Sequence, residues 1–455
     1  MSSINSNPGM ARAGRKAFND RPSLRRAHFS VDWIAVLLFA AGILRFVEFR
    51  STGTLFGTDL AVLAGLPFAF SRTNKIGNYP ESKRVLILSI LWLLAAIITD
   101  IVMGTSFDDI ARGWAKVAMF SATMFVLIVV SELKFHRIVF YMCGLAVAIL
   151  LEIRFHPAPY QIGYPWKFGL GTSFSVLAAA LASLIGRRAG WGWFRLLPLI
   201  LVGILCLANN ARSIFGTVAL TVAAVLALRA LGPLFRRIRK PWLVSVVIVV
   251  IGVPTVMGIV NTYGYLADSG ILGIEAQQKY QAQTASGGNV LLGGRNEMLV
   301  SSRAIWESPI VGHGSWAKST EYRAMLVSIL RAQGVDAKIE HRTGEGIPSH
   351  SYFFQAWVEH GILGALFWIF CIILVLRSIP YVLRSERGEA PIFFFAIFTL
   401  LWSILFSPFG ADDRFYAAGE ICMALWSMRE AASKAVSARV LSSATAGRSI
   451  SVGAA

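Results

Sequence analysis

Residues 85–104 read VLILSILWLLAAIITDIVMG, an almost entirely apolar run. A helix of about 20 residues spans about 30 Å, which matches the hydrocarbon core of a bilayer. Similar apolar runs recur along the chain, whereas the alternating strands that build a membrane barrel are missing. A backbone inside a bilayer must satisfy its own hydrogen bonds. The runs therefore predict an all-α, polytopic bundle of membrane helices.

The composition supports this prediction. Of the 455 residues, 55% are hydrophobic and 15% are charged, against roughly 25% charged residues in soluble proteins. We expect about twelve transmembrane helices. They are placed at residues 33–49, 54–71, 85–104, 114–132, 138–153, 166–186, 195–211, 213–232, 242–260, 352–376, 390–407 and 415–429.

Lysine and arginine gather in alternate connections between these runs, for example at residues 72–84 and 236–240. Because short positive loops stay in the cytoplasm, this pattern predicts that both termini are cytoplasmic. The expected location is a bacterial inner (plasma) membrane. The first span, rather than a cleaved peptide, is expected to direct insertion. The expected parts are a basic cytoplasmic segment 1–32, transmembrane helices one to nine over 33–260, a large periplasmic loop over 261–349, helices ten to twelve over 350–430 and a flexible cytoplasmic tail over 431–455.

The net charge of +18 follows from this topology, so no nucleic-acid partner is expected and the partner surface is the lipid bilayer. The four cysteines all lie inside apolar runs without CxxC pairing, which indicates neither a disulfide framework nor a cysteine metal site. Four of the seven histidines fall between His313 and His360, but their spacing matches no metal motif. No metal and no cofactor are expected.

The connection over residues 261–349 is unusually long, and long loops are commonly functional. Two helices are expected in it. One runs from Asn296 to Trp306 and is stopped by Pro309. The other runs from Glu321 to Ala332 and carries an apolar stripe, which should pack on the bundle rather than lie on the membrane surface.

Gly294 and Arg295 directly precede the first of these helices. A glycine before a helix start allows close approach of an anion, and a guanidinium binds two phosphate oxygens at once. The pair is therefore a candidate phosphate or diphosphate clamp. The alternative is a plain turn with a solvated arginine.

His350 and Ser351 end the loop at the start of a long apolar run, where a neutral histidine could act as a general base. The alternative is an interfacial helix cap. Arg212 separates two apolar runs on the same expected side, either as a second phosphate contact or as a side chain that reaches the interface. Glu359 lies about 13 Å further along the helix from His350 and should face the bundle interior.

Further polar groups on that side could line a cavity with Glu359 or pair with one another. They are Glu152, Arg154, His156, Asp412, Asp413 and Arg414.

Three stretches resemble the O-antigen ligase and polymerase superfamily. The first is Gly294-Arg295 followed by Trp306, Ser308-Pro309-Ile310 and Gly312-His313-Gly314. The second is His350-Ser351 with Gly361 after nine intervening residues and then Gly364. The third is Ala211-Arg212-Ser213, which departs from the family's Ser-Arg-Gly. The long loop between the ninth and tenth expected spans is also similar to the family's architecture.

This resemblance implies a metal-independent membrane glycosyltransferase. Its donor would be an oligosaccharide on undecaprenyl diphosphate, with Arg212 and Arg295 binding the diphosphate and His350 accepting the proton of the attacking hydroxyl. Gly294, Ser351 and Glu359 are expected to contact substrate.

Two acceptors fit the resemblance. A ligase would transfer the glycan to lipid A–core, and the His-Ser-x9-Gly form favours it. A polymerase would join lipid-linked repeat units for O-antigen, capsule or exopolysaccharide. A secondary transporter is a third hypothesis, and it predicts broken helices with polar residues at the midplane.

Overall fold

The computed structural model describes residues 31–50, 53–74, 79–186, 192–238, 240–284, 295–332, 346–383 and 388–452. Residues Ile34–Ala455 form one compact unit, and of the other unit, Met1–Trp33, only 31–33 are described. The described residues form sixteen α-helices, which confirms the all-α prediction, together with one small hairpin. Its strands, β1 (Glu48–Arg50) and β2 (Thr54–Phe56), pair antiparallel.

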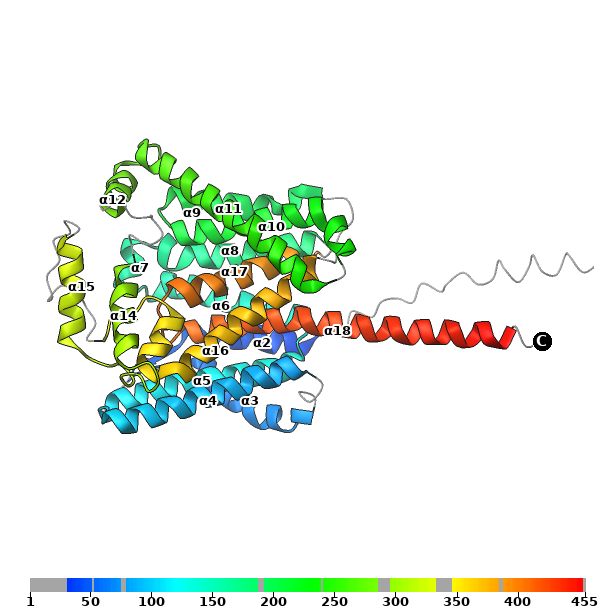
Figure 1. Ribbon diagram of the computed structural model, residues 1–455, viewed down its shortest axis with the longest axis horizontal. Helices are drawn as coiled ribbons and strands as arrows, with labels where there is room; N and C mark the ends of the chain where they lie inside the picture. Colours follow the sequence, from blue (N-terminus) through cyan, green and yellow to red (C-terminus); the bar gives the residue numbers. More distant parts are fainter. Residues whose placement is uncertain are drawn as a thin grey trace, which may run out of the picture. The chain divides into compact units, whose positions relative to one another are not determined.

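The first half of the chain is a series of apolar helices (Figure 1). Their bounds are α2 (Trp33–Ile43), η1 (Leu44–Phe46), α3 (Gly57–Phe70), α4 (Pro80–Met103), α5 (Phe107–Ser131), α6 (Phe135–Phe155), α7 (Pro159–Gly163), η3 (Trp166–Leu170), α8 (Gly171–Ile185), η4 (Gly192–Leu196), α9 (Leu197–Ala208) and α10 (Arg212–Arg237).

The second half contains the long connection and the last apolar helices. Their bounds are α11 (Pro241–Asp268), α12 (Ile274–Thr284), α14 (Asn296–Glu307), α15 (Thr320–Ala332), α16 (Tyr352–Leu383), α17 (Ala390–Phe406) and α18 (Asp413–Val452). Both helices predicted inside the connection are confirmed as α14 and α15. The helix α11 continues eight residues past its predicted end at 260, since it ends at Asp268.

Among the described residues, six helices are long and apolar enough to cross a membrane. The chain is therefore a multi-pass membrane protein. The six are Pro80–Met103, Phe107–Ser131, Phe135–Phe155, Trp166–Ile185, Arg212–Phe235 and Tyr352–Leu383. Four shorter apolar helices lie at Trp33–Phe46, Gly57–Phe70, Gly192–Ala208 and Ala390–Phe406.

Aromatic side chains fill the core where α4 packs against α5 and α16. Trp92 of α4 stacks on Phe367 at 5.2 Å and meets Phe120, Trp368 and Phe409 edge-on or tilted. All five are buried. Offset and edge-on aromatic contacts add to the burial of their large apolar surfaces, so this cluster fixes the α4–α16 contact that positions the long connection.

Candidate functional site

Arg295 precedes the first residue of α14, and its side chain is half-buried. The guanidinium carbon lies 5.7 Å from the ring centre of Trp402 and 5.4 Å from that of Phe406, both near the C-terminal end of α17. Burial lowers the pKa of Arg295, and only Glu297 opposes this shift. Within the described part of the chain, no carboxylate forms an ion pair with Arg295. Its contacts there are aromatic.

His350 is exposed and Ser351 is fully buried at the start of α16. The Ser351 hydroxyl donates to the carbonyl of Ile404 (2.7 Å) and accepts the N–H of Phe354 (3.1 Å). The second bond is a helix N-cap, which satisfies one of the unpaired N–H groups of the first turn. Ile404 lies on α17 between the two rings that contact Arg295. The structure thus brings Arg295 and the His350–Ser351 pair to the same end of α17.

Arg212 begins α10, after a break at Asn209–Ala211 in which Asn210 has a positive φ of 55°. Its guanidinium lies over the ring of Tyr263 on α11, 4.9 Å from the ring centre. The helix α10 packs along α17. The described contact of Arg212 is therefore with α11, whereas Arg295 contacts α17. Gly294 lies outside the described residues.

Glu359 is buried in α16, and both of its oxygens are engaged. Lys116 of α5 lies 2.9 Å from Oε2, and Gln355 donates to Oε1 at 3.1 Å. The oxygen of Gln355 in turn accepts the N–H of Phe409 (2.7 Å). A paired, buried carboxylate of this kind ties α5, α16 and the segment after α17 together.

The helix α16 is broken at His360 and Gly361. The backbone angles φ and ψ are −129° and 17° at His360, and 65° and −159° at Gly361. The second pair is accessible essentially only to glycine. A Cβ at Gly361 would lie 1.9 Å from the carbonyl oxygen of Ile310. The glycine that ends the His-Ser-x9-Gly motif is therefore required by this break.

The turn after α14 occupies the break in α16. The N–H groups of His313 and Gly314 donate to the carbonyls of Val358 (2.8 Å) and Glu359 (3.0 Å), which the break leaves without helical partners. The N–H of Ile362 donates in the opposite direction, to the carbonyl of Ile310 (3.3 Å). Two of the motif stretches quoted above thus form one joint, which holds α14 against α16.

A buried polar cluster lies beneath this joint, and the sequence reasoning did not single it out. The carboxylate of Asp100 accepts the N–H (2.6 Å) and hydroxyl (2.8 Å) of Ser315, the hydroxyl of Thr105 (2.9 Å) and the indole N–H of Trp114 (2.8 Å). The signal was present, because Asp100 is the lone charge of residues 85–104.

His360 completes the cluster. Its Nδ1 accepts the indole N–H of Trp92 (3.0 Å), so its Nε2 carries the proton and donates to the Ser315 hydroxyl (3.1 Å). Both His360 and Ser315 are only 1% exposed. This serine, histidine and aspartate cluster is therefore shielded from solvent, and its hydrogen bonds hold the joint together.

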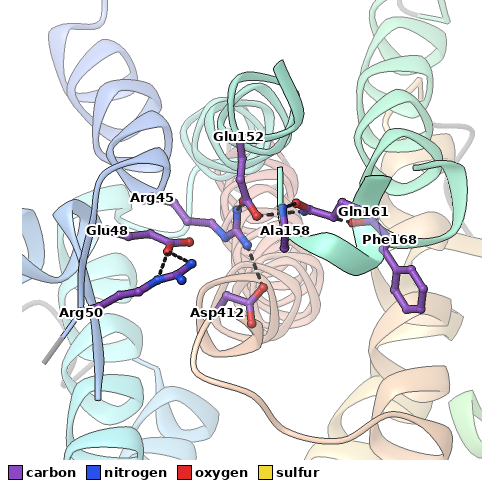
Figure 2. A network of polar contacts seen from close by, with 8 residues as sticks. All are labelled: Arg45, Glu48, Arg50, Glu152, Ala158, Gln161, Phe168 and Asp412. Carbon is purple, nitrogen blue, oxygen red and sulfur yellow. Dashed lines mark hydrogen bonds and ion pairs between the residues drawn. The ribbon is translucent and has the colours of Figure 1, made fainter. Parts of the chain in front are cut away.

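A second buried network lies at Arg45, at the end of the α2–η1 segment (Figure 2). Figure 2 shows its guanidinium between the carboxylates of Glu152 (2.6 Å) and Asp412 (2.7 Å), with Gln161 donating to the other oxygen of Glu152 (2.8 Å). Glu152 and Asp412 thus pair with a residue outside the predicted set rather than with one another. Their shared partner, Arg45, was not foreseen.

Arg414 and His156 of that set, and His313 of the long connection, also have described partners. Arg414 pairs with Asp59 of α3, and the two are 3% and 0% exposed. His156 stacks on Phe46 with 5.6 Å between ring centres. His313 lies in the turn, and its Nε2 is 2.8 Å from the carbonyl oxygen of Ala304 in α14, so this hydrogen bond joins the turn to the helix.

No group of three or more histidine, cysteine, aspartate and glutamate side chains in the described ranges is arranged to hold a metal ion. No protein-family model matches the chain, and no curated protein matches it.

Proposed function

We propose that this protein transfers a glycan from undecaprenyl diphosphate to an acceptor hydroxyl on the non-cytoplasmic side of the membrane. The proposal rests on the surroundings of the Arg295 guanidinium. The buried cations Arg45, Lys116 and Arg414 each pair with a carboxylate. Arg295 is half-buried against aromatic rings and has no such ion pair among the described residues. A partly desolvated guanidinium of this kind suits a diphosphate.

In the proposed reaction, the acceptor oxygen forms a bond to the anomeric carbon of the donor sugar, and the bond from that carbon to the diphosphate oxygen breaks. His350 accepts the proton of the acceptor hydroxyl. The diphosphate leaves with the bonding electron pair, and Arg295 and Arg212 stabilise its charge. Ser351 caps α16 and so holds His350 beside the end of α17, and Gly294 is proposed as a further substrate contact. The chemistry needs no metal or cofactor.

The proposed setting is a bacterial inner membrane, with about twelve spans and both termini cytoplasmic. The six long and four shorter apolar helices support a high span number, and α11 and α18 would complete it. The lipid tail of the donor would enter from the bilayer between helices.

We propose lipid A–core as the acceptor, which makes the protein an O-antigen ligase, with the polymerase as second candidate. In a deletion strain, loss of all long chains from lipopolysaccharide with accumulation of lipid-linked polymer supports the ligase. Chains of a single repeat support the polymerase.

The broken helix α16 is a feature that the transporter hypothesis predicts. However, the turn after α14 fills this break with direct hydrogen bonds, and His360 is 1% exposed. A break that is filled and buried in this way favours the glycosyltransferase over the transporter.

The test is transfer from undecaprenyl-diphosphate oligosaccharide by purified protein with divalent ions chelated. Arg295→Ala should lower the rate by about 10²-fold, because one donor to the developing charge is lost, and Arg295→Lys should restore only part of it. His350→Ala should also abolish transfer. The matched control is Arg303→Ala on the exposed side of α14, which should retain the rate. Normal transfer by well-folded Arg295→Ala protein refutes the proposal.

A further inference from the structure

The turn after α14 reaches into the level of the membrane-spanning helices. The carbonyl of Val311 accepts the hydroxyl of Thr99 (2.6 Å), four residues before the end of α4 at Met103. The neighbouring carbonyl of Ile310 accepts the N–H of Ile362, where the second part of α16 begins. With a rise of about 1.5 Å per residue, Thr99 lies roughly one helical turn inside α4. The turn is thus wedged between two membrane-spanning helices.

Backbone N–H and carbonyl groups of this turn are hydrogen-bonded to other protein groups, which is needed where no water can bind them. The four consecutive carbonyls from Pro309 to Gly312 accept the Trp357 indole, the Ile362 N–H, the Thr99 hydroxyl and the Ser308 hydroxyl. The four consecutive N–H groups from Gly312 to Ser315 also have partners. Irregular backbone at membrane depth is tolerated only where the protein satisfies it in this way.

The side chains on the outer face of α14 and its turn are apolar and exposed. Leu299, Trp306 and Ile310 are 58%, 81% and 74% exposed. The opposite face of α14, with Val300 and Ala304, is fully buried against α15 and α16. A large exposed tryptophan beside an isoleucine in the same patch is unfavourable in water but typical of the membrane–water interface.

The two spans that hold the turn also expose apolar side chains next to the residues that bind it. On α4, next to Thr99, the side chains of Ile98, Ile101 and Val102 are 57%, 69% and 63% exposed. On α16, next to Ile362, Leu363 and Leu366 are 38% and 39% exposed. Because these residues belong to membrane-spanning helices, their solvent is lipid.

From the depth of the turn and these exposed apolar side chains we infer that α14 is an interfacial helix. Its outer face, defined by Leu299, Trp306 and Ile310, is immersed in the non-cytoplasmic leaflet of the bilayer. Arg303 lies on the same face by helical spacing, four residues after Leu299, whereas Arg295 precedes the helix and turns toward α17. The partner of this surface is the lipid leaflet, and the inference does not depend on glycosyl transfer.

The test is the depth of a spin label in full-length protein, reconstituted into phosphatidylethanolamine and phosphatidylglycerol vesicles with its four native cysteines replaced by alanine. Trp306→Cys and Ile310→Cys are labelled separately, with Ile101→Cys as the lipid-facing control and Ser328→Cys on the exposed side of α15 as the aqueous control. Relative to Ser328→Cys, collisions of the Trp306 and Ile310 labels with a water-soluble nickel chelate should fall several-fold, as they do for Ile101→Cys, while collisions with oxygen rise.

Nickel collisions equal to those of Ser328→Cys would overturn the inference. Shielding from both oxygen and nickel would overturn it as well, because protein rather than lipid would then cover the face. As a second measurement, unmodified protein in vesicles that contain a diazirine-bearing phospholipid should form adducts in the peptide over residues 296–310. Absence of adducts there, with adducts on α4, counts against the inference.

Discussion

Asp100 holds Ser315 at two points: its Oδ1 accepts the serine N–H at 2.6 Å and its Oδ2 accepts the serine hydroxyl at 2.8 Å. The two residues are 215 positions apart. Because Ser315 directly follows the turn that fills the break in α16, this contact fastens the long connection to α4. One buried carboxylate thereby joins a membrane-spanning helix to the long connection.

Replacing Asp100 by asparagine should loosen the connection. Asparagine offers one oxygen instead of two, and its amide would face donors, so the cost should be about 1.5–3 kcal/mol, as for a hydrogen bond to a charged group. The measurement is thermal unfolding in detergent together with limited proteolysis of the segment after α11. Asp108→Asn, at an exposed position on α5, is the control and should behave like the natural protein.

Gly361→Ala should be severely destabilising. The backbone region that Gly361 adopts costs any other residue about 1–3 kcal/mol, and the added Cβ would clash with the carbonyl of Ile310. The expected result is loss of monodisperse protein on size exclusion. The matched change is Gly216→Ala in α10, where a Cβ meets nothing within 4 Å. Equal yields of monodisperse protein from the two variants would contradict the hydrogen-bonded joint between the turn after α14 and the break in α16.

The pair Lys116–Glu359 offers a double-mutant cycle that separates packing from substrate binding. Lys116→Met should cost about 3–5 kcal/mol, because Glu359 is left buried without its cation, and Lys116→Met/Glu359→Leu should recover most of that loss. Thermal unfolding gives the stability, and glycan transfer is assayed in parallel. Recovered stability with recovered transfer indicates a structural carboxylate, whereas recovered stability without transfer indicates that Glu359 binds substrate.

The contact between α14 and α15 should weaken in acid. The hydrogen bond from the Tyr322 hydroxyl, with help from Arg303, holds the pKa of Glu307 below its ordinary value of 4.5. A carboxyl with a lowered native pKa stabilises the fold above its ordinary pKa, and this contribution is lost as the pH falls through the lowered native value. The difference in melting temperature between natural protein and Tyr322→Phe should therefore shrink from about pH 7 to about pH 3. If this difference in melting temperature did not change with pH, ionised Glu307 would not stabilise the contact between α14 and α15.

Helices in and around the long connection were largely predictable, because their signals are local. Pro309 follows α14 closely, and the run from Glu321 matches α15. The break in α16 was not predicted. The run over 352–376 reads as one continuous apolar helix, and His360–Gly361 becomes a break only because the turn at Ile310–Gly314 supplies the hydrogen bonds that the helix gives up.

The candidate site residues were recognisable as local features of the sequence, and their roles stay predictions. The sequence pointed to Arg295 and His350–Ser351, which converge on the end of α17. The partners of the other charged residues were harder to predict from the sequence. Glu152 and Asp412 were expected either to line a cavity or to pair within their own set, yet Arg45, which lies 107 residues from Glu152, binds both.

By itself, the sequence determined that this protein is a bundle of membrane helices, because partition into lipid depends on the length and apolarity of one segment at a time. Only the tertiary structure decided which charges are neutralised, where α16 breaks and which face of α14 is left exposed. Each of these depends on contacts between segments far apart in the chain, and a buried charge or an open backbone group is stable only when such a partner is in place.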